Sequence, residues 1–309
     1  MNKIRVAVIG TGYLGSLHAK IYRQLKECSL EAVCDIDKTR LSQLGNELGV
    51  PAVTDYRELF GKVDAVSIAV PTVLHHKIAL DCLKNNIHAL VEKPFTTNLK
   101  EADSLIRIAG AKKLILQVGH IERFNSAILA IEPYLKKPKF IECQRLGPFH
   151  KRVNDVGVVL DLMIHDIDII LGLVNSPVKK IDAVGVNVLT PFEDIANARI
   201  TFKSGCVANL TASRISDEAM RKIRIFLKNA YISLDYRNQQ AFIYRKTASG
   251  ISKEALSIEK EQPLQKELSS FLDCVIHNKE PLVSGEVARQ ALSVALKIRG
   301  QIWKKPKRS

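Results

Sequence analysis

The sequence lacks the features that mark membrane-spanning, disulfide-linked and zinc-binding proteins. None of its apolar runs reaches the roughly 20 residues that a helix needs to cross a bilayer. The chain does not open with the basic and apolar regions of a secretory signal peptide. Its six cysteines are scattered without a Cys-x-x-Cys pair, which favours reduced core thiols over disulfides or a zinc site. We therefore expect a cytoplasmic protein with no membrane span and no bound metal.

Acidic residues are outnumbered by basic ones, which gives a formal net charge of +14. The basic residues are spread along the chain, with a small concentration in the tail at 304–308. Because no recognised nucleic-acid-binding module is present, we expect no nucleic-acid partner. A solvated, lysine-rich surface accounts for the charge. Attraction of an anionic ligand, such as a dinucleotide or a nucleotide sugar, is the second interpretation.

The first hundred or so residues alternate strand-like apolar runs with helical patterns. We expect strands at 4–9, 30–34, 65–70, 88–91 and 114–118, and helices at 14–25, 38–48, 73–83 and 99–109. This alternation predicts parallel β-α-β units with right-handed crossovers. Residues 1–119 are therefore predicted to form a Rossmann-type, doubly wound parallel sheet.

After about Gly119 the pattern changes to consecutive alternating segments. We expect helices at 121–135, 156–173, 264–277 and 285–303, and strands at 181–189, 196–202, 206–213, 222–227, 231–235 and 241–245. Strands without helices between them indicate a mostly antiparallel sheet. The fold class is thus α/β, with residues 120–309 forming an α+β substrate-binding and oligomerisation domain. Its open sheet predicts a homodimer or homotetramer.

A glycine-rich turn follows the first predicted strand, and a helical pattern starts near Tyr13. Gly10 allows the tight turn, Gly12 lets the backbone approach a pyrophosphate, and Gly15 permits close packing of helix on strand. The helix N-terminus adds free N–H groups and a positive dipole end. This context predicts a dinucleotide site.

Asp35 stands at the end of the second predicted strand, twenty residues after the last glycine of the turn. A carboxylate at this place accepts hydrogen bonds from the adenosine ribose and repels a 2′-phosphate, which favours NAD over NADP. Lys38 and Arg40 lie nearby and soften that preference.

Lys93 ends an apolar run at the carboxyl edge of the predicted sheet, where ligands bind in open α/β proteins. An ion pair with Glu92 is the structural alternative for this lysine. Further along, Asp161 and His165 stand four residues apart in a strongly apolar helical segment. At this spacing both side chains share one helix face, and a histidine beside a carboxylate suits a general base.

Three structural alternatives compete with catalysis for this second group. Asp161 and His165 could satisfy each other in the core, or could together bind a metal. Asp166 and Asp168 could belong to a charged helix surface. The residues alone leave these alternatives open.

Taken together, these motifs resemble the Gfo/Idh/MocA oxidoreductases from end to end. The similar segments are Gly10–Gly15, Ala69–His75, Glu92–Pro94, Asp161 with His165, Glu267 with Phe271, and Glu280–Glu286. The resemblance implies that Lys93 contacts cofactor and substrate, that the Lys93–Pro94 bond is commonly cis, that His165 is the base and that Asp161 holds the substrate. The expected NAD-binding residues are Gly10, Thr11, Gly12, Tyr13, Leu14, Gly15, Asp35, Arg40, Pro71, Thr72, His75, Glu92 and Lys93.

Segments 118–125 and 161–170 are similar to a subgroup that acts on UDP-N-acetylglucosamine. Its members oxidise the 3-hydroxyl to a keto group, which an aminotransferase can aminate on the way to lipid A. The resemblance gives substrate-binding roles to His120, Arg123, Asn125, Asp161 and Arg214. An ordinary surface or inter-subunit ion pair is the alternative for Arg123 and Arg214.

Two other functions stay open at the level of sequence. A related dehydrogenase could act on a UDP-sugar acid, an inositol or another free polyol, although Arg123, Arg145 and Arg214 favour a nucleotide sugar. A non-catalytic NAD-binding sensor belongs to a different class, since a fold does not dictate a function. The intact set of Lys93, Asp161 and His165 argues against a sensor.

Overall fold

The chain divides into two compact units in a computed structural model that describes residues 3–149 and 156–304. The first unit comprises residues 1–121 and 262–289, and the second comprises 122–261 and 290–309. The expected division was at 119/120, with everything after it in the second domain. The structure differs in one respect, because residues 262–289 return to the first unit. The basic tail beyond Lys304 lies outside the described residues.

A six-stranded parallel sheet forms the centre of the first unit. Its strands are β1 (Ile4–Ile9), β2 (Cys28–Cys34), β3 (Ala52–Val53), β4 (Ala65–Ile68), β5 (His88–Glu92) and β6 (Leu116–Gly119). Their order, β3-β2-β1-β4-β5-β6, is that of dinucleotide-binding Rossmann domains. The predicted doubly wound sheet is confirmed. The sequence missed β3 and the 3₁₀ turn Tyr56–Leu59, which are too short for a periodic pattern.

Four helices follow the strands of this sheet: α1 (Tyr13–Gln24), α2 (Lys38–Leu48), α3 (Thr72–Lys84) and α4 (Leu99–Lys112). Local signals fix their ends. Asp37 begins α2 by accepting hydrogen bonds from two backbone N–H groups, and Gly49 ends it in the left-handed conformation. Asn98 caps α4 in the same way as Asp37 caps α2.

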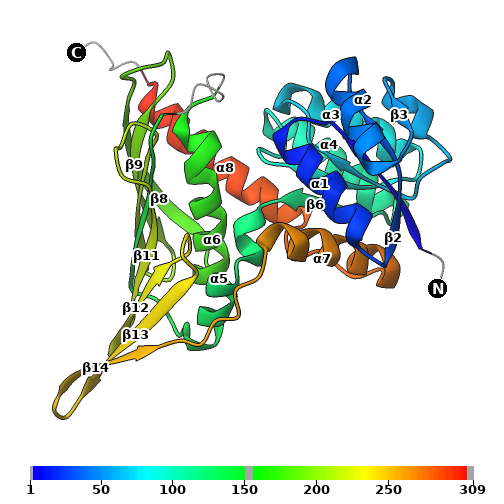
Figure 1. The fold of residues 1–309 in the computed structure, drawn as a ribbon. Coiled ribbons are helices and arrows are strands. Elements are labelled where there is room, and N and C mark those ends of the chain that lie inside the picture. The colour runs from blue at the N-terminus through cyan, green and yellow to red at the C-terminus, as the bar shows by residue number, and fades with distance from the viewer. Residues whose placement is uncertain (1–2, 150–155, 305–309) are drawn as a thin grey trace. The chain divides into compact units, whose positions relative to one another are not determined.

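Helix α7 (Pro263–His277) completes the core of the first unit, beside α1 (Figure 1). Its apolar face inserts Leu268, Phe271 and Leu272 into the cluster formed by strand residues such as Val6 and Leu90. This burial explains why a segment so late in the chain belongs with the Rossmann sheet: without it, a whole apolar face would meet water.

An eight-stranded, mostly antiparallel sheet forms the second unit. Its strands are β7 (Phe140–Leu146), β8 (Val178–Val186), β9 (Ile195–Phe202), β10 (Val207–Ser213), β11 (Met220–Phe226), β12 (Ala230–Asp235), β13 (Gln240–Thr247) and β14 (Gly250–Ala255). Their order is β14-β13-β12-β11-β7-β10-β9-β8, and β7 and β10 form its parallel pair. The predicted open sheet is confirmed, although the sequence missed β7 and β14.

Helices cover one face of this sheet, as Figure 1 shows for α5 (Ser126–Ile131) and α6 (Ile164–Val174). The last turns of α8 (Gly285–Ile302) lie against β8, where the Gln301 side chain donates to the carbonyl of Ile181 over 2.7 Å. The inward residues of the strands, such as Ile141 and Leu210, are fully buried.

Of the helices expected in the second unit, one is broken and another begins with a π-helical turn. Residues 121–135 form a 3₁₀ turn (Ile121–Phe124), α5 and a second turn (Glu132–Tyr134). The first break occurs because Asn125 is extended and caps α5, and the second coincides with Pro133. The helix expected at 156–173 starts with a π-helical turn, Val159–Met163, before α6. Such turns occur frequently at functional sites.

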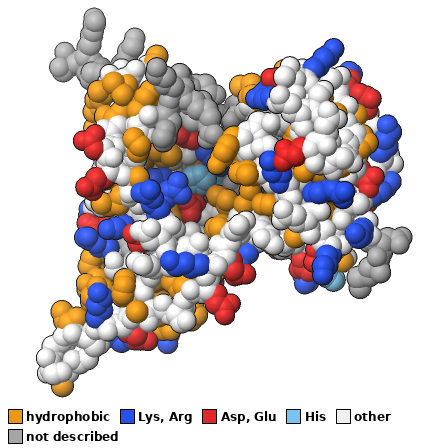
Figure 2. Space-filling model, viewed as in Figure 1, with side chains coloured by type: hydrophobic (Ala, Val, Ile, Leu, Met, Phe, Trp, Pro, Cys, Tyr) orange, Lys and Arg blue, Asp and Glu red, His pale blue; other side chains and the backbone are white. Residues whose placement is uncertain are grey.

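Lys and Arg side chains are spread over the visible face of both units and mixed with acidic ones (Figure 2). This distribution agrees with the interpretation of the net charge as a solvated surface. All six cysteines are buried free thiols, as expected. Over residues 3–149 and 156–304, no helix combines the length and the apolar character that crossing a membrane requires.

Candidate cofactor and substrate sites

A pocket of about 450 Å³ opens at the carboxyl ends of β1, β2 and β4. This is the point where the strand order of the sheet reverses, and ligands of open α/β folds bind in the crevice there. Of the predicted cofactor residues, it is lined by Gly10, Gly12, Asp35, Arg40 and Pro71.

The three glycines of the turn differ in the space around them, and that difference tests the dinucleotide prediction. A Cβ on Gly10 would lie 2.4 Å from the carbonyl oxygen of Ala69, and one on Gly15 would lie 1.8 Å from that of Gly10. These two glycines keep the backbone tightly packed. A Cβ on Gly12 would meet no described atom within 4 Å, so this position opens onto free space beside the N-terminus of α1. The geometry fits a pyrophosphate.

Gly12→Val is expected to weaken NAD binding by about tenfold or more, because the side chain would occupy the space beside the helix N-terminus. Its thermal unfolding should match the wild type, since Gly12 has a φ of −63° and no close neighbours. Gly15→Val is the contrasting variant and should unfold at a lower temperature. Equal NAD affinity in Gly12→Val and the wild type, measured by calorimetry, would refute this placement.

Asp35 lies between the pocket and the glycine turn. Its carboxylate accepts hydrogen bonds from the backbone N–H groups of Thr11 and Asp37, over 2.6 and 2.9 Å. Burial alone would raise the pKa of Asp35, but these hydrogen bonds outweigh it and lower the pKa. Asp35 is therefore a fixed anion in the wall of this pocket, as the predicted ribose contact requires. The Arg40 guanidinium lies 3.9 Å from it and is half exposed.

Lys93 follows β5 directly, and the Lys93–Pro94 peptide bond is cis. Its backbone N–H donates to Oε2 of Glu92 over 3.2 Å. Glu92 itself is buried and pairs with His18 of α1, with 3.2 Å between Oε1 and Nε2. The structure thus places the Glu92 carboxylate in the interior of the unit, and its contact with the cofactor stays a prediction. The ion pair of Glu92 with His18 lies on the side of β5 that faces α1.

The contacts of His75 give this residue a structural role. Its ring is buried, with Nε2 2.8 Å from the carbonyl oxygen of Val70 and Nδ1 3.0 Å from that of Pro94. Burial lowers the pKa of His75, and the two carbonyl contacts oppose that effect only in part. The ring therefore ties the loop after β4 to the loop after β5.

The remaining cofactor predictions occupy the edges of the same region. Thr11 is buried and donates its hydroxyl to Asp35, whereas Tyr13 is 67% exposed. Leu14 packs against the core cluster, and Thr72 begins α3 behind Pro71. Thr11 and Leu14 thus shape the turn itself.

A second pocket, of about 460 Å³, lies within the second unit. It joins Asp161, from the π-helical turn, with four arginines. These are Arg145, Arg214, Arg221 and Arg237. His165 lies in the first turn of α6 and is buried. Asp161 therefore faces a cavity with cationic walls, which is a suitable environment for an anionic substrate.

Two of the four arginines are buried in structural ion pairs. Arg145 donates to Asp166 from Nε and to Glu122 from a terminal nitrogen, over 3.1 and 3.2 Å. The Tyr236 hydroxyl also donates to Asp166, over 2.5 Å. This network fixes α6 to the sheet beside His165. Asp166 and Asp168 are both buried, so the alternative of a charged helix surface is wrong.

Arg214 is the second buried arginine. It donates to the Asp194 carboxylate, the Val156 carbonyl and the Thr190 hydroxyl, over 2.7–2.8 Å. Asp194 in turn accepts three backbone N–H groups, and these bonds lower its pKa although burial acts in the opposite direction. Arg214 therefore holds the turn after β8 through a buried pair within the chain, which differs from the expected surface or inter-subunit pair, and it also lines the pocket.

Arg123 and Asn125 do not line the pocket of Asp161. The Arg123 guanidinium lies over Gly172 and 3.6 Å from Asp168, and it lines a separate cavity of about 240 Å³. Asn125 accepts from Ala127 N–H and donates to the Tyr236 carbonyl. His120 is buried directly after β6, in the first unit. We leave Arg123 and Asn125 out of the substrate site proposed below.

The exposed guanidinium groups of the pocket, Arg221 and Arg237, escaped the sequence interpretation. They stand on β11 and on the turn after β12, in segments that carry several other basic residues. Nothing in their spacing distinguishes them from an ordinary solvated surface. Only the structure distinguishes them, because it places them in one pocket with Asp161.

The sequence model of the NAD-binding Rossmann domain of the Gfo/Idh/MocA oxidoreductases matches residues 4–120, and the model of the family's C-terminal domain matches residues 133–233. The chain belongs to the Gfo/Idh/MocA oxidoreductase family. It is accordingly an NAD-dependent dehydrogenase, and its expected family, fold and cofactor are confirmed.

Two relatives are similar to this chain over almost its whole length. The chain is 36% identical to the UDP-N-acetylglucosamine 3-dehydrogenase of Acidithiobacillus ferrooxidans, over 97% of each chain. A solved structure of that enzyme superposes with a TM-score of 0.93 over 98% of both chains. The myo-inositol 2-dehydrogenase of Thermotoga maritima is 26% identical over 94% of this chain and 93% of its own. These similarities support a sugar dehydrogenase.

Proposed function

We propose that this dehydrogenase oxidises the 3-hydroxyl of UDP-N-acetylglucosamine to a keto group. The observation that carries the proposal is the pocket in which Asp161 shares a cavity with Arg221 and Arg237. Arg221 already pairs with Glu122 over 3.2 Å, whereas the exposed Arg237 donates to the carbonyl of Ala219. A nucleotide diphosphate would offer an anion to this face of the pocket, which a neutral polyol would not. The relative from Acidithiobacillus ferrooxidans, which carries that activity in its name, supports the same substrate.

In the proposed reaction, His165 accepts the proton of the sugar hydroxyl. Lys93 donates a hydrogen bond to the same oxygen and stabilises its developing negative charge. Asp161 accepts a hydrogen bond from the sugar and orients it. NAD supplies the hydride acceptor, so one C–H and one O–H bond are lost, and a keto sugar, NADH and a proton are formed.

Rigid surroundings hold Lys93 and His165 in place. Lys93 is held through its backbone N–H by the buried Glu92 carboxylate. The residue after His165, Asp166, is fixed to the sheet by Arg145 and Tyr236. Side chains whose neighbours are fixed keep a productive geometry without paying further ordering entropy during the reaction.

Arg237→Ala is expected to raise the KM for UDP-N-acetylglucosamine by about tenfold or more, because one cationic partner of the diphosphate is lost. The kcat and the KM for NAD should change little. Arg224→Ala, on the same sheet but outside the pocket, is the matched control. Steady-state kinetics of the wild type and of the two variants measure these constants. An unchanged KM in Arg237→Ala would place the diphosphate elsewhere.

A panel of substrates tests the assignment itself. NADH formation should be fast with UDP-N-acetylglucosamine and slow with free N-acetylglucosamine or myo-inositol, when the keto product is trapped. Preference for the inositol would favour the alternative function, to which the Thermotoga maritima relative points. Tight NAD binding with no turnover of any sugar would favour a sensor.

The proposed biological setting follows from the product. A 3-keto nucleotide sugar is a substrate for transamination, and we place the enzyme in the cytoplasm before an aminotransferase, in the synthesis of lipid A or a surface polysaccharide. Detection of the 3-amino sugar when the two enzymes are combined tests this order. Its absence would remove the pathway assignment and leave the oxidation untouched.

We also propose that the enzyme is a homo-oligomer, formed through the sheet face that its own helices leave open. This face carries a row of neighbouring rings, Phe140, Phe226, Tyr231 and Tyr244. The last three are stacked, with 4.2 Å between the centroids of the two tyrosines. Such apolar rows are uncommon on the free surface of a monomer. Light scattering should give a mass of two or four chains, and the mass of one chain would contradict the proposal.

A further inference from the structure

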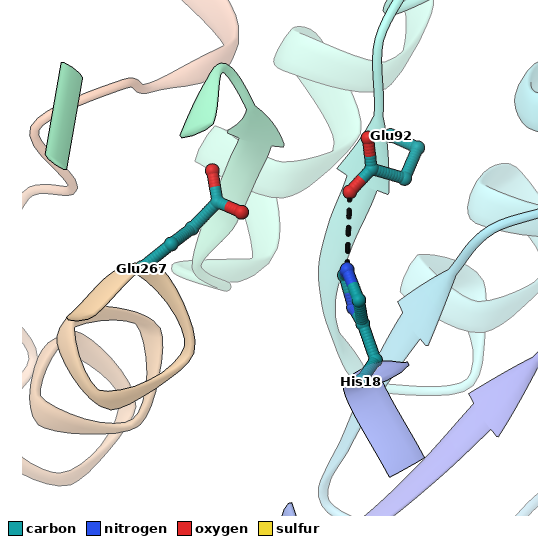
Figure 3. Close-up of side chains that lie close together, drawn as sticks. All are labelled: His18, Glu92 and Glu267. Atoms are coloured by element: carbon teal, nitrogen blue, oxygen red, sulfur yellow. Dashed lines mark ion pairs between the residues drawn. The ribbon is translucent and has the colours of Figure 1, made fainter. Parts of the chain in front are cut away.

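Three ionisable side chains converge inside the first unit, from three separate elements. They are His18 of α1, Glu92 at the end of β5 and Glu267 of α7, and Figure 3 shows the two carboxyl groups and the imidazole directed toward one another. Their donor and acceptor atoms all lie within 4.8 Å of one another. His18 and Glu267 have no exposed surface, and Glu92 is 6% exposed. Water therefore does not solvate the charge of this cluster.

Glu267 is the member that needs an explanation. Neither of its carboxyl oxygens has a hydrogen-bond partner among the described residues. Burial, and then the nearby Glu92 carboxylate, raise the pKa of Glu267 well above its ordinary value. An unpaired anion in a dry interior is costly, and the cost disappears when the carboxyl group is protonated.

The groups that face Glu267 offer it little cationic compensation. Helix α1 contributes His18 and Tyr22, β5 contributes Glu92, and β6 contributes the neutral Gln117, whose side chain donates to the Glu267 carbonyl. The imidazole of His18 is already placed 3.2 Å from Glu92. The Glu92 carboxylate, which can accept a proton, therefore lies close to the carboxyl group of Glu267, which has no hydrogen-bond partner among the described residues.

A divalent cation is the competing occupant of this cluster. Structural zinc takes four protein ligands, and magnesium and calcium take six or more oxygen ligands, several of them usually from water. The cluster supplies three ligand atoms and is closed to solvent. A proton needs one donor and one acceptor, which Glu267 and Glu92 provide.

Glu92 connects the cluster to Lys93. One of its carboxyl oxygens lies against His18, and the other accepts the backbone N–H of Lys93. Gly119 of the neighbouring strand packs directly against the same carboxylate, since a Cβ there would lie 2.6 Å from Oε1. The carboxylate thus fixes the point from which the Lys93 side chain departs.

We propose that Glu267 is a neutral carboxylic acid whose proton faces the Glu92 carboxylate, and that this contact holds Glu92 where it positions Lys93 for the reaction. The role as a positioning residue rests on the function proposed above for Lys93. The protonation of Glu267 does not rest on it. The two parts are therefore tested separately.

Infrared difference spectra test protonation without any substrate. The wild type should show the carbonyl stretch of a protonated carboxylic acid at neutral pH, and Glu267→Gln should lack it, while the exposed control Glu58→Gln retains it. Absence of this band from the wild type would overturn the proposal. So would one divalent metal ion per chain that Glu267→Gln fails to retain, measured by elemental analysis of the purified protein.

The pH dependence of stability gives an independent check. Because folding raises this pKa above 4.5, the stability that the neutral acid contributes is fully present at low pH and is lost as the pH rises through the folded-state pKa. The advantage of wild type over Glu267→Gln in denaturant unfolding should therefore shrink as the pH rises. An advantage that grows with pH would show that the carboxylate is the preferred form.

Kinetics test the positioning role. Glu267→Leu removes the donor and should lower kcat by about ten- to hundredfold, the range for a small misplacement, with the KM for NAD unchanged. Glu267→Gln keeps a neutral donor and should restore kcat to within about threefold of the wild type. Equal losses of kcat in both variants, with normal unfolding temperatures, would refute the positioning role. An inactive wild type would instead count against the proposed substrate, and the spectra would still decide the protonation.

Discussion

Replacing Lys93 with Met is expected to lower kcat by about two orders of magnitude or more, the range for a positioned acid–base group. Methionine has a similar length but no charge, so the substrate oxygen loses the donor that stabilises its negative charge. NAD binding should be largely intact, because the turn at Gly12 and the Asp35 carboxylate lie on other strands of the sheet. Steady-state turnover and calorimetric NAD binding, measured on the same preparation, separate the two effects.

The exposed Lys100, on the following helix, provides the control. Lys100→Met removes the same charge from the same unit and should leave kcat unchanged. Near-normal turnover of Lys93→Met would remove the lysine from the mechanism. Loss of NAD affinity in parallel with kcat would instead make it a cofactor-binding residue.

Replacing His165 with Gln is the second large change, with an expected loss of about two to four orders of magnitude in kcat. Glutamine retains hydrogen-bonding groups but cannot take up the proton that leaves the sugar hydroxyl. The side chain is buried, and the neighbouring Asp166 holds the helix in place through Arg145, so the fold should persist. The KM for the sugar should change far less than kcat.

His277→Gln is the corresponding control, since His277 is half exposed and forms a surface ion pair with Asp273. It should turn over as fast as the wild type. If His165→Gln kept more than about a tenth of the wild-type kcat, proton abstraction would have to be assigned to another group. That result would favour the alternative in which Asp161 and His165 satisfy each other in the core.

Periodicity predicted the first unit well. Parallel strands buried on both faces are nearly continuous apolar runs, so β1, β4 and β5 were located to within about two residues, and α2 was found at its observed ends, Lys38 and Leu48. The return of α7 to this unit could not be foreseen. Its amphipathic pattern shows that one face is buried, but a pattern does not name the partner surface.

The second unit was harder to predict because its breaks depend on single residues and on packing. Asn125 caps α5 only because its neighbours allow the chain to leave the helix there, and the π-helical turn around Asp161 has the same apolar pattern as an α-helix. Strand β7 lies in the middle of the sheet, yet its mixed residues, including the buried Arg145, hid its strand character.

The candidate sites show the same division. Motifs with a fixed backbone geometry, such as the glycine turn, could be placed from the sequence. The sequence could not assign roles to charged residues, because an arginine that binds a substrate and an arginine in a buried ion pair have no distinguishing sequence pattern. Only the structure separates Arg214, which is bonded to Asp194, from Arg237, whose side chain is exposed beside the pocket of Asp161.

Transfer of the hydrogen from carbon 3 of the sugar tests the central claim most directly. The enzyme would be incubated with NAD and UDP-N-acetylglucosamine carrying deuterium at carbon 3 of the sugar, and the NADH formed would be examined by mass spectrometry. The proposed reaction predicts that the deuterium appears in NADH and that the remaining sugar is the 3-keto product. Unlabelled NADH, or no NADH at all, would contradict it.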